Sequence, residues 1–258
     1  MVYVTGDTHG EAHRLEMIEK ENHLQAGDTV IVCGDFGYVK AELAAYLDEL
    51  ETRPYTICFV DGNHENFSLI YSVPEKEWCG GHVHEIRRNV LHLMRGYCFT
   101  IEGHTSFAMG GAASEPSDKV DRMLTEHKGG PKNWWAEEIP SAEEMRRASA
   151  TLRERENKVD YILSHNAPRE LLLKKRGRDV SWDKDRELTG FFDWMLYEVS
   201  FTAWFTGHWH DDMELTEDAM RTTGLFDRLR ADQQPQTEGK RVGRVFLLYF
   251  NVVPIEPA

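Results

Sequence analysis

The first quarter of the chain alternates short apolar runs with polar turns and helix-prone stretches. We expect strands at Val2–Thr5, Thr29–Cys33 and Thr56–Val60, each followed by a polar turn. We expect helices over residues 11–24, 40–51 and around Phe67–Ile70. Strands that alternate with helices predict a mostly parallel sheet with right-handed crossovers. Ligands bind at the carboxyl ends of such strands, so the three turns are expected to share one edge of the sheet.

The pattern changes to period-two alternation between residues 83 and 109. Runs at 90–94, 97–101 and 105–109, separated by Gly96 and Gly103, predict an antiparallel meander. Two further strand-then-turn units follow, at 161–165 and 203–210. Residues 245–253 are expected to form a closing strand.

Residues 113–158 form a polar, helix-prone segment between these strands. It is broken by the Gly-Gly-Pro sequence at 129–131 and by Pro140, after which Ser141 is predicted as the N-cap of a helix. No internal repeat or low-complexity tract is evident. We therefore expect a single α/β domain over residues 1–258 with this helical segment inserted in it.

The composition excludes several classes of partner. Acidic residues outnumber basic ones by 44 to 30, for a net charge of −14, which disfavours long nucleic acid as a partner. No apolar run reaches the roughly 18 residues of a membrane span, so no membrane partner is expected. The N-terminus lacks the features of a secretory signal, and the four cysteines form no Cys-x-x-Cys pair. The expected location is therefore the cytoplasm.

Metal-ligating side chains gather directly after the predicted strands. They are Asp7, His9, Asp35, Asn63, His64, His165, His208 and His210. Each one alone has an ordinary explanation, such as a capping Asp or a surface His. Chance rarely places all of them at successive strand ends, so together they favour a functional site.

This set of side chains suits a pair of divalent metal ions. Such ions favour a mixed shell of carboxylate, amide and imidazole ligands. Two ions about 4 Å apart need a bridging carboxylate, and they clamp the attacking and leaving oxygens of an in-line displacement. Water bound there ionises near neutral pH and becomes a nucleophile. One histidine would remain over to act as an acid.

The motifs that carry these side chains resemble, in order, those of the calcineurin-like metallophosphoesterases. They are Gly-Asp-Thr-His-Gly at 6–10, Gly-Asp at 34–35, Gly-Asn-His-Glu at 62–65, Ser-His at 164–165 and Gly-His-Trp-His at 207–210. The spacings 35 − 7 and 63 − 35 are both 28, which fits one βαβ step each. The residues around 60–67 and the later Trp134-Trp135 pair resemble a bacterial branch of the family.

The resemblance implies a fold and an activity. The implied fold is a four-layer αββα sandwich, in which two facing mixed β-sheets are flanked by helices. The implied enzyme hydrolyses a small phosphomonoester or phosphodiester with a hydroxide held between two divalent ions. Manganese is the expected metal, with iron or zinc as alternatives.

The resemblance also implies a role for each strand-end residue. One group would hold the first metal: Asp7, His9 and His210. Another would hold the second: Asn63, His165 and His208. Asp35 would bridge both ions. His64 would lie off the metals and donate a proton to the leaving oxygen or stabilise its charge.

The sequence departs from the protein serine/threonine phosphatases of this superfamily. Those enzymes carry Asp-Arg-Gly after the second motif and Arg before Gly-Asn-His-Glu. Here Tyr38, Val39 and Asp61 occupy these positions. A protein phosphatase of that type is disfavoured, and the sequence does not reveal what orients His64.

The segment 114–140 is the candidate source of substrate contacts. Lys119 and Arg122 would share one face of a helix, while Trp134 and Trp135 would form an aromatic wall. We expect Arg122 to point toward the phosphate position and at least one tryptophan to line the entrance. The alternative is a solvated charged face with both indoles in the core.

Two other functions stay open at this stage. A cyclic-nucleotide phosphodiesterase or nuclease would use the same centre, although the acidic surface disfavours long nucleic acid. A non-catalytic scaffold that binds protein partners would be expected to have lost metal ligands, and this chain retains the full set. The sequence does not fix the oligomeric state.

Overall fold

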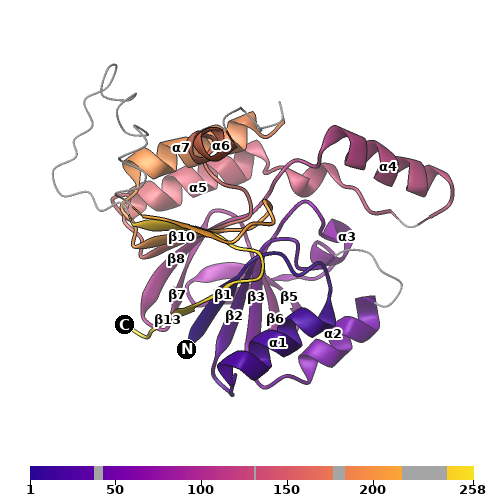
Figure 1. Cartoon of the computed structure of the whole chain (residues 1–258), viewed down its shortest axis with the longest axis horizontal. Helices are drawn as coiled ribbons and strands as arrows, with labels where there is room; N and C mark the ends of the chain where they lie inside the picture. The colour runs from indigo at the N-terminus through magenta and orange to yellow at the C-terminus, as the bar shows by residue number, and fades with distance from the viewer. Residues whose placement is uncertain (38–42, 131, 177–183, 217–242) are drawn as a thin grey trace.

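Two β-sheets pack face to face in the computed structural model, which describes residues 1–37, 43–130, 132–176, 184–216 and 243–258 (Figure 1). The first is a 7-stranded sheet in the order β13-β1-β2-β3-β6-β5-β4. Its strands are β1 (Val2–Thr5), β2 (Thr29–Cys33), β3 (Thr56–Val60), β4 (Glu75–Trp78), β5 (Gly81–Arg87), β6 (Val90–Leu93) and β13 (Val252–Ile255).

The second is a 6-stranded sheet in the order β11-β12-β10-β9-β8-β7. Its strands are β7 (Tyr97–Ile101), β8 (His104–Met109), β9 (Tyr161–Ser164), β10 (Ala203–Thr206), β11 (Met213–Leu215) and β12 (Arg244–Leu247). Strands β1 to β3 run parallel to each other, as do β8, β9, β10 and β12. The predicted parallel core is confirmed.

Helices cover the outer face of each sheet. The helices are α1 (Ala12–Asn22), α2 (Leu43–Glu51), α3 (Phe67–Ile70), α4 (Pro116–His127), α5 (Ala142–Glu154), α6 (Arg169–Arg176) and α7 (Arg186–Glu198), with a 3-10 turn at Ala136–Glu138. Leu15 of α1 and Leu47 of α2 pack with Val30 of β2 on the first sheet. Leu152 of α5 and Phe192 of α7 belong to the core on the second.

A third core lies between the two sheets. Ile31 and Val60 of the first sheet pack there with Leu163 and Phe205 of the second. Because both faces of the central strands are covered, these strands are continuously apolar rather than alternating. The four-layer αββα arrangement expected from the sequence is confirmed.

The predicted meander over 90–109 is wrong in its first half. Strand β6 pairs parallel with β3 and antiparallel with β5, whereas β7 and β8 form a hairpin in the other sheet. The chain crosses between sheets at Gly96, whose φ of +79° favours glycine. A Cβ at this glycine would lie 2.8 Å from the backbone nitrogen of Ala148 in α5. Alternating apolar residues predict strands but do not identify the partner strand.

The expected closing strand over 245–253 is also divided between the sheets. Strand β12 belongs to the second sheet and β13 to the first. The carboxylate of Asp212 holds the turn between them, since it accepts hydrogen bonds from the backbone nitrogens of Tyr249, Phe250 and Asn251.

The segment 113–158, expected to be helical, contains α4, the 3-10 turn and α5. Helix α4 ends before Gly129, and it projects from the body of the molecule in Figure 1. The Ser141 hydroxyl caps α5 in a reciprocal capping box with Glu144, as the sequence indicates. Tyr38, Val39 and Pro131 lie outside the described residues. Over the described ranges, each helix is too short or too polar to traverse a bilayer.

Candidate metal centre

The turns that follow the parallel strands meet at one edge of the two sheets. Those after β1, β2 and β3 carry Asp7, His9, Asp35, Asn63 and His64. Those after β9 and β10 carry His165, His208 and His210. The edge therefore collects the strand-end residues of both sheets, as the alternation of strands and helices leads one to expect.

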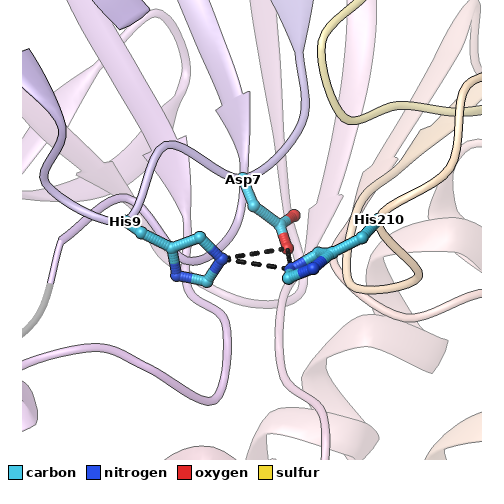
Figure 2. Close-up of side chains that lie close together, drawn as sticks. All are labelled: Asp7, His9 and His210. Carbon is cyan, nitrogen blue, oxygen red and sulfur yellow. Dashed lines mark hydrogen bonds and ion pairs between the residues drawn. The ribbon is translucent and has the colours of Figure 1, made fainter. Parts of the chain in front are cut away.

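Asp7, His9 and His210 form a first cluster of donor atoms (Figure 2). The Nε2 atoms of the two histidines lie 3.1 Å apart. Asp7 Oδ2 lies 3.0 Å from His210 Nε2 and 3.7 Å from His9 Nε2. Asp7 and His9 follow β1 of the first sheet and His210 follows β10 of the second, so this cluster spans the two sheets.

A second cluster lies around the buried ring of His165. Its Nε2 lies 3.4 Å from Asp35 Oδ1 and 3.2 Å from Asn63 Oδ1. Its Nδ1 lies 2.8 Å from the backbone oxygen of Cys33. The ring of His208 packs against that of His165 with 4.9 Å between centroids.

Asp35 lies next to both clusters. Its Oδ1 is the oxygen near His165, while its Oδ2 lies 4.0 Å from His9 Nδ1. Asp35 thus lies beside a histidine of each cluster, with its Oδ2 nearest to Nδ1 of His9 rather than to the Nε2 that faces Asp7. Asp7 likewise reaches both clusters, since its Oδ1 lies 3.8 Å from His165 Nδ1.

Backbone strain is concentrated at these turns. Four non-glycine residues of the site have positive φ angles: His9 at 49°, Asp35 at 49°, His208 at 66° and His210 at 45°. Such angles are uncommon outside glycine and cost free energy that the surroundings must offset. The turns adopt conformations that aim side chains at a common point.

Glycines allow the turns to approach each other closely. A Cβ at Gly62 would lie 2.1 Å from Asp35 Oδ1, and a Cβ at Gly207 would lie 2.2 Å from Asp7 Oδ1. At Gly34, with φ +87°, it would lie 2.1 Å from His165 Nδ1. The glycines of the motifs therefore leave the space that the ligand side chains fill.

The electrostatics follow from close packing of carboxylates and imidazoles. Burial opposes the protonation of His165, but the Asp35 and Asp7 carboxylates outweigh it and raise its pKa to about 10. Burial and the neighbouring His165 lower the pKa of His208 to about 3. The pKa of Asp35 lies well below its usual value because, although burial raises it, the surrounding histidines lower it further.

The donor set fits divalent cations. Asp7 Oδ2 is buried and accepts no well-aligned hydrogen bond, although two imidazole nitrogens converge on it. Imidazole, carboxylate and amide groups together suit manganese, iron or zinc. A cation between these atoms would satisfy Asp7 Oδ2 and could be bound by both Nε2 atoms.

The order and geometry of these turns agree with a match to a known family. A family model described as calcineurin-like phosphoesterase matches residues 1–212. The chain belongs to this family of calcineurin-like phosphoesterases. A search of curated proteins found no match.

A solved structure similar to this calcineurin-like phosphoesterase is the phosphopantetheinyl hydrolase of Mycobacterium tuberculosis. The two chains are 18% identical over 84% of this chain and 86% of that one, with a TM-score of 0.40.

The structure places His64 beside the clusters rather than within them. Its backbone nitrogen donates to Asp35 Oδ1 at 2.8 Å, and its half-buried ring packs edge-on against His9 with 5.6 Å between centroids. The ring nitrogen Nδ1 of His64 lies 3.5 Å from Nη1 of Arg122. Arg122 is thus brought to the edge of the site, with a guanidinium that is largely buried.

The other candidate substrate contacts lie in different surroundings. Lys119 Nζ lies 3.9 Å from the ring centroid of Trp134, and Lys184 Nζ lies 5.8 Å from it. Trp135 is 4% exposed in the core on the first sheet, and its indole nitrogen donates to Ser68 Oγ at 2.8 Å. Both tryptophans also line a groove of about 1080 Å³ along α4.

Sequence reasoning missed three residues that hold these turns together. Glu65 accepts hydrogen bonds from the backbone nitrogens of Phe36, Gly37 and Gly62, so it ties the turn after β2 to the turn after β3. Burial, with the charge of Asp35, raises the pKa of Glu65 to about 8.

Ser114 and Glu138 are the other two. Ser114 Oγ accepts a hydrogen bond from Asn63 Nδ2 at 3.3 Å and donates to Glu138 Oε2 at 2.5 Å. Glu65 was visible in the Gly-Asn-His-Glu motif, but no sequence pattern marks Ser114 or Glu138.

Proposed function

We propose that this calcineurin-like phosphoesterase is a binuclear metal-dependent hydrolase of small phosphomonoesters or phosphodiesters. The observation that carries the proposal is the position of Asp35, whose two oxygens face a histidine from each cluster. This geometry suits one carboxylate shared by two cations.

The proposed ligands follow the two clusters. Asp7, His9 and His210 would hold one ion, with Asp35 shared between the pair. The second ion would be held by Asn63, His165 and His208. Manganese is the metal that we propose, and iron and zinc suit the same donors. The two ions would supply Lewis acidity and make water nucleophilic near neutral pH.

The protein's own groups would then orient the substrate and assist the leaving group. Ser114 holds the amide of Asn63, so that its Oδ1 faces His165. His64 would donate a proton or a hydrogen bond to the leaving oxygen. We propose that Lys119 and Trp134 contact the substrate in addition to the metals. The Lys119 ammonium lies over the Trp134 indole, so a positive charge and an aromatic side chain are next to each other.

The nuclease alternative is disfavoured by the charge of the chain. A net charge of −14 opposes a long polyanion but leaves small nucleotides and cyclic nucleotides within the proposed substrate class. The scaffold alternative is disfavoured because the chain retains the full set of expected metal ligands, and it predicts a protein that hydrolyses no phosphoester.

Removal of the proposed bridge tests the function. Asp35→Asn takes away the shared charge and is expected to abolish both the occupancy of the metal pair and turnover. Chelation of the metals should abolish the activity of the wild type, and addition of Mn²⁺ should restore that activity. Elemental analysis and a panel of monoesters, diesters and cyclic nucleotides provide the readouts.

The control for this experiment is Asp160→Asn, an exchange of the same type at a partly exposed residue that precedes β9. It is expected to keep both metals and full turnover. Full activity of metal-free wild type would contradict the proposed function. Metal binding without hydrolysis of any ester in the panel would favour the scaffold.

A further inference from the structure

One ring nitrogen of His64 lies beside a cation. His64 Nδ1 lies 3.5 Å from Nη1 of Arg122, a residue of α4 far from the metal motifs in sequence. The protein phosphatases of the superfamily carry an aspartate after the second motif, where this chain has none. The geometry therefore identifies a different neighbour for the histidine.

The guanidinium of Arg122 is fixed by several hydrogen bonds. Nη1 donates to the backbone oxygens of Asn63 and Asn133, both at 3.1 Å. Nη2 donates to Ser114 Oγ and lies 3.7 Å from Glu138 Oε2. Arg122 is 8% exposed and Glu138 is 2% exposed, so this network is held out of solvent.

These bonds tie Arg122 to the turn that carries His64. Asn63, whose backbone and side chain both join the network, immediately precedes the histidine. The guanidinium is planar and carries only donors, so it presents a fixed N–H fork to its neighbours. One end of the fork, Nη1, thus contacts both the Asn63 backbone and the His64 ring, while the other end, Nη2, contacts Ser114.

The donor chemistry of arginine determines the tautomer that its neighbour adopts. Because a guanidinium is positively charged and carries only donors, whose two Nη1 hydrogens are shared with the Asn63 and Asn133 oxygens, a bare Nδ1 lone pair is favoured on the side of His64 that faces Nη1. The ring hydrogen then lies on Nε2. Which nitrogen of a histidine carries the hydrogen is set in this way by the bond that the other nitrogen makes.

We propose that Arg122 is a positioning residue that holds His64 as its Nε2–H tautomer, ready to donate to the leaving oxygen. This inference rests on the proposed function, and it assigns to Arg122 a role exerted through His64 instead of a direct grip on phosphate. In the proposed hydrolysis, a hydroxide oxygen derived from water forms a new bond to phosphorus, and the bond from phosphorus to the leaving oxygen breaks with its electron pair on that oxygen. The Nε2–H group stabilises that charge by a hydrogen bond, and solvent supplies the final proton.

Kinetics of the Arg122 substitution in the wild type and in His64→Ala separate a positioning role of Arg122 from a structural one. We would measure kcat and KM of the Mn²⁺-loaded wild type, Arg122→Gln, His64→Ala and the double variant. The substrates are a nitrophenyl ester and an alkyl ester of phosphate. Arg146→Gln, an exposed arginine on α5, is the matched control. Metal content is measured for each variant.

The expected loss is specific to the poor leaving group. Arg122→Gln should lower kcat for the alkyl ester by about 10-fold to 100-fold, the scale for removing a residue that orients a functional group. The nitrophenyl ester should lose less, with KM nearly unchanged. In the His64→Ala background the same substitution should have no further effect, since residues that act as a unit are not additive. Arg122→Lys should recover part of the loss.

Additive losses in the double variant would overturn the proposal. An equal rise in KM for both esters with kcat unchanged would also overturn it, because that pattern indicates a direct phosphate contact. A wild type inactive toward both the monoesters and the diesters of these alcohols would contradict the proposed function instead.

The tautomer can be measured without any activity. Protein with ¹⁵N-labelled histidine is loaded with diamagnetic Zn²⁺, and the His64 signals are assigned by their loss in His64→Ala. Hydrogen on Nε2, with an Nδ1 signal that shifts in Arg122→Gln but not in Arg146→Gln, is the expected result. Hydrogen on Nδ1 would overturn the proposal even if Arg122→Gln fails to fold.

Discussion

The backbone and the side chain of His64 have different partners. The backbone nitrogen donates to Asp35, the proposed bridge, whereas the ring lies between His9 and Arg122. Among the described residues, this ring belongs to neither group of converging donor atoms, which are Asp7 with His9 and His210 and Asp7 with Asp35 and His165. Metal binding and chemistry should therefore be separable at this residue.

His64→Ala is expected to keep both metals while kcat falls by roughly 10²–10⁴, the usual scale for losing an acid–base group. The fall should be smaller for a nitrophenolate leaving group, which needs little assistance. Elemental analysis and kinetics on two esters measure the outcome. If the metal content drops to one ion, His64 is a ligand and its proposed role is wrong.

Most strands, and the polar turns that follow them, could be predicted from the local pattern of apolar and polar residues. The alternation of apolar runs and polar turns predicted β1, β2, β3, β9 and β10, and it put the strand-end residues at one edge. The antiparallel pairing of β7 with β8 was also predicted, whereas the partners of β6, β12 and β13 could not be, because a short apolar run fits either sheet. The crossing points depend on Gly96 and Asp212, whose roles arise from tertiary contacts.

In the candidate site, too, some residues could be predicted from the local sequence, whereas others are found only from tertiary contacts. The residues of the five motifs carry their chemistry in their identity and order, and the structure brings them together. Ser114 and Glu138 carry no such signal, since they reach Asn63 and Arg122 only after the 113–138 segment has packed.

The turn after β3 tests how tightly the site is packed. An alanine Cβ at Gly62 would lie 2.1 Å from Asp35 Oδ1 and 2.4 Å from the Asp35 backbone nitrogen, and the backbone atom cannot easily move aside. Gly62→Ala is expected to lower the free energy of unfolding by about 1–3 kcal/mol, the usual cost of overpacking. It should also weaken metal binding, because Asp35 is displaced.

Gly190→Ala in α7 is the matched control, since a Cβ there meets no atom within 4 Å. It is expected to stabilise the protein by about 0.5–1 kcal/mol, as an alanine does in a helix interior. Chemical denaturation and a metal titration measure both variants. Unchanged stability and metal affinity in Gly62→Ala would show that the turns are less tightly packed than the structure indicates.

At the scale of the whole molecule, the site exists only where the two sheets meet. The first cluster takes Asp7 from one sheet and His210 from the other, and the second joins Asp35 to His165 in the same way. The carboxylate of Asp7 also accepts a hydrogen bond from the backbone nitrogen of His208 at 2.9 Å. Packing of the sheets and assembly of the site are therefore one event.

A buried ion network joins the first sheet to the segment before α5. Asp61 forms an ion pair with Arg95 and lies 3.0 Å from His92 Nε2. Burial acts to raise the pKa of Asp61, but Arg95 and His92 outweigh it and hold the pKa below its usual value. Arg95 also donates to the backbone oxygen of Glu137 at 2.8 Å. Because Glu138 follows directly, this network supports the residues around Arg122.

The central claim is that Asp35 bridges two metal ions. Anomalous X-ray diffraction from crystals of the Mn²⁺-loaded protein tests it directly, because manganese scatters anomalously and the protein ligands do not. We expect two peaks about 4 Å apart, one on each side of the Asp35 carboxylate. One should lie among Asp7, His9 and His210, and the other beside His165. A single peak, or two peaks that do not share Asp35, would contradict the account.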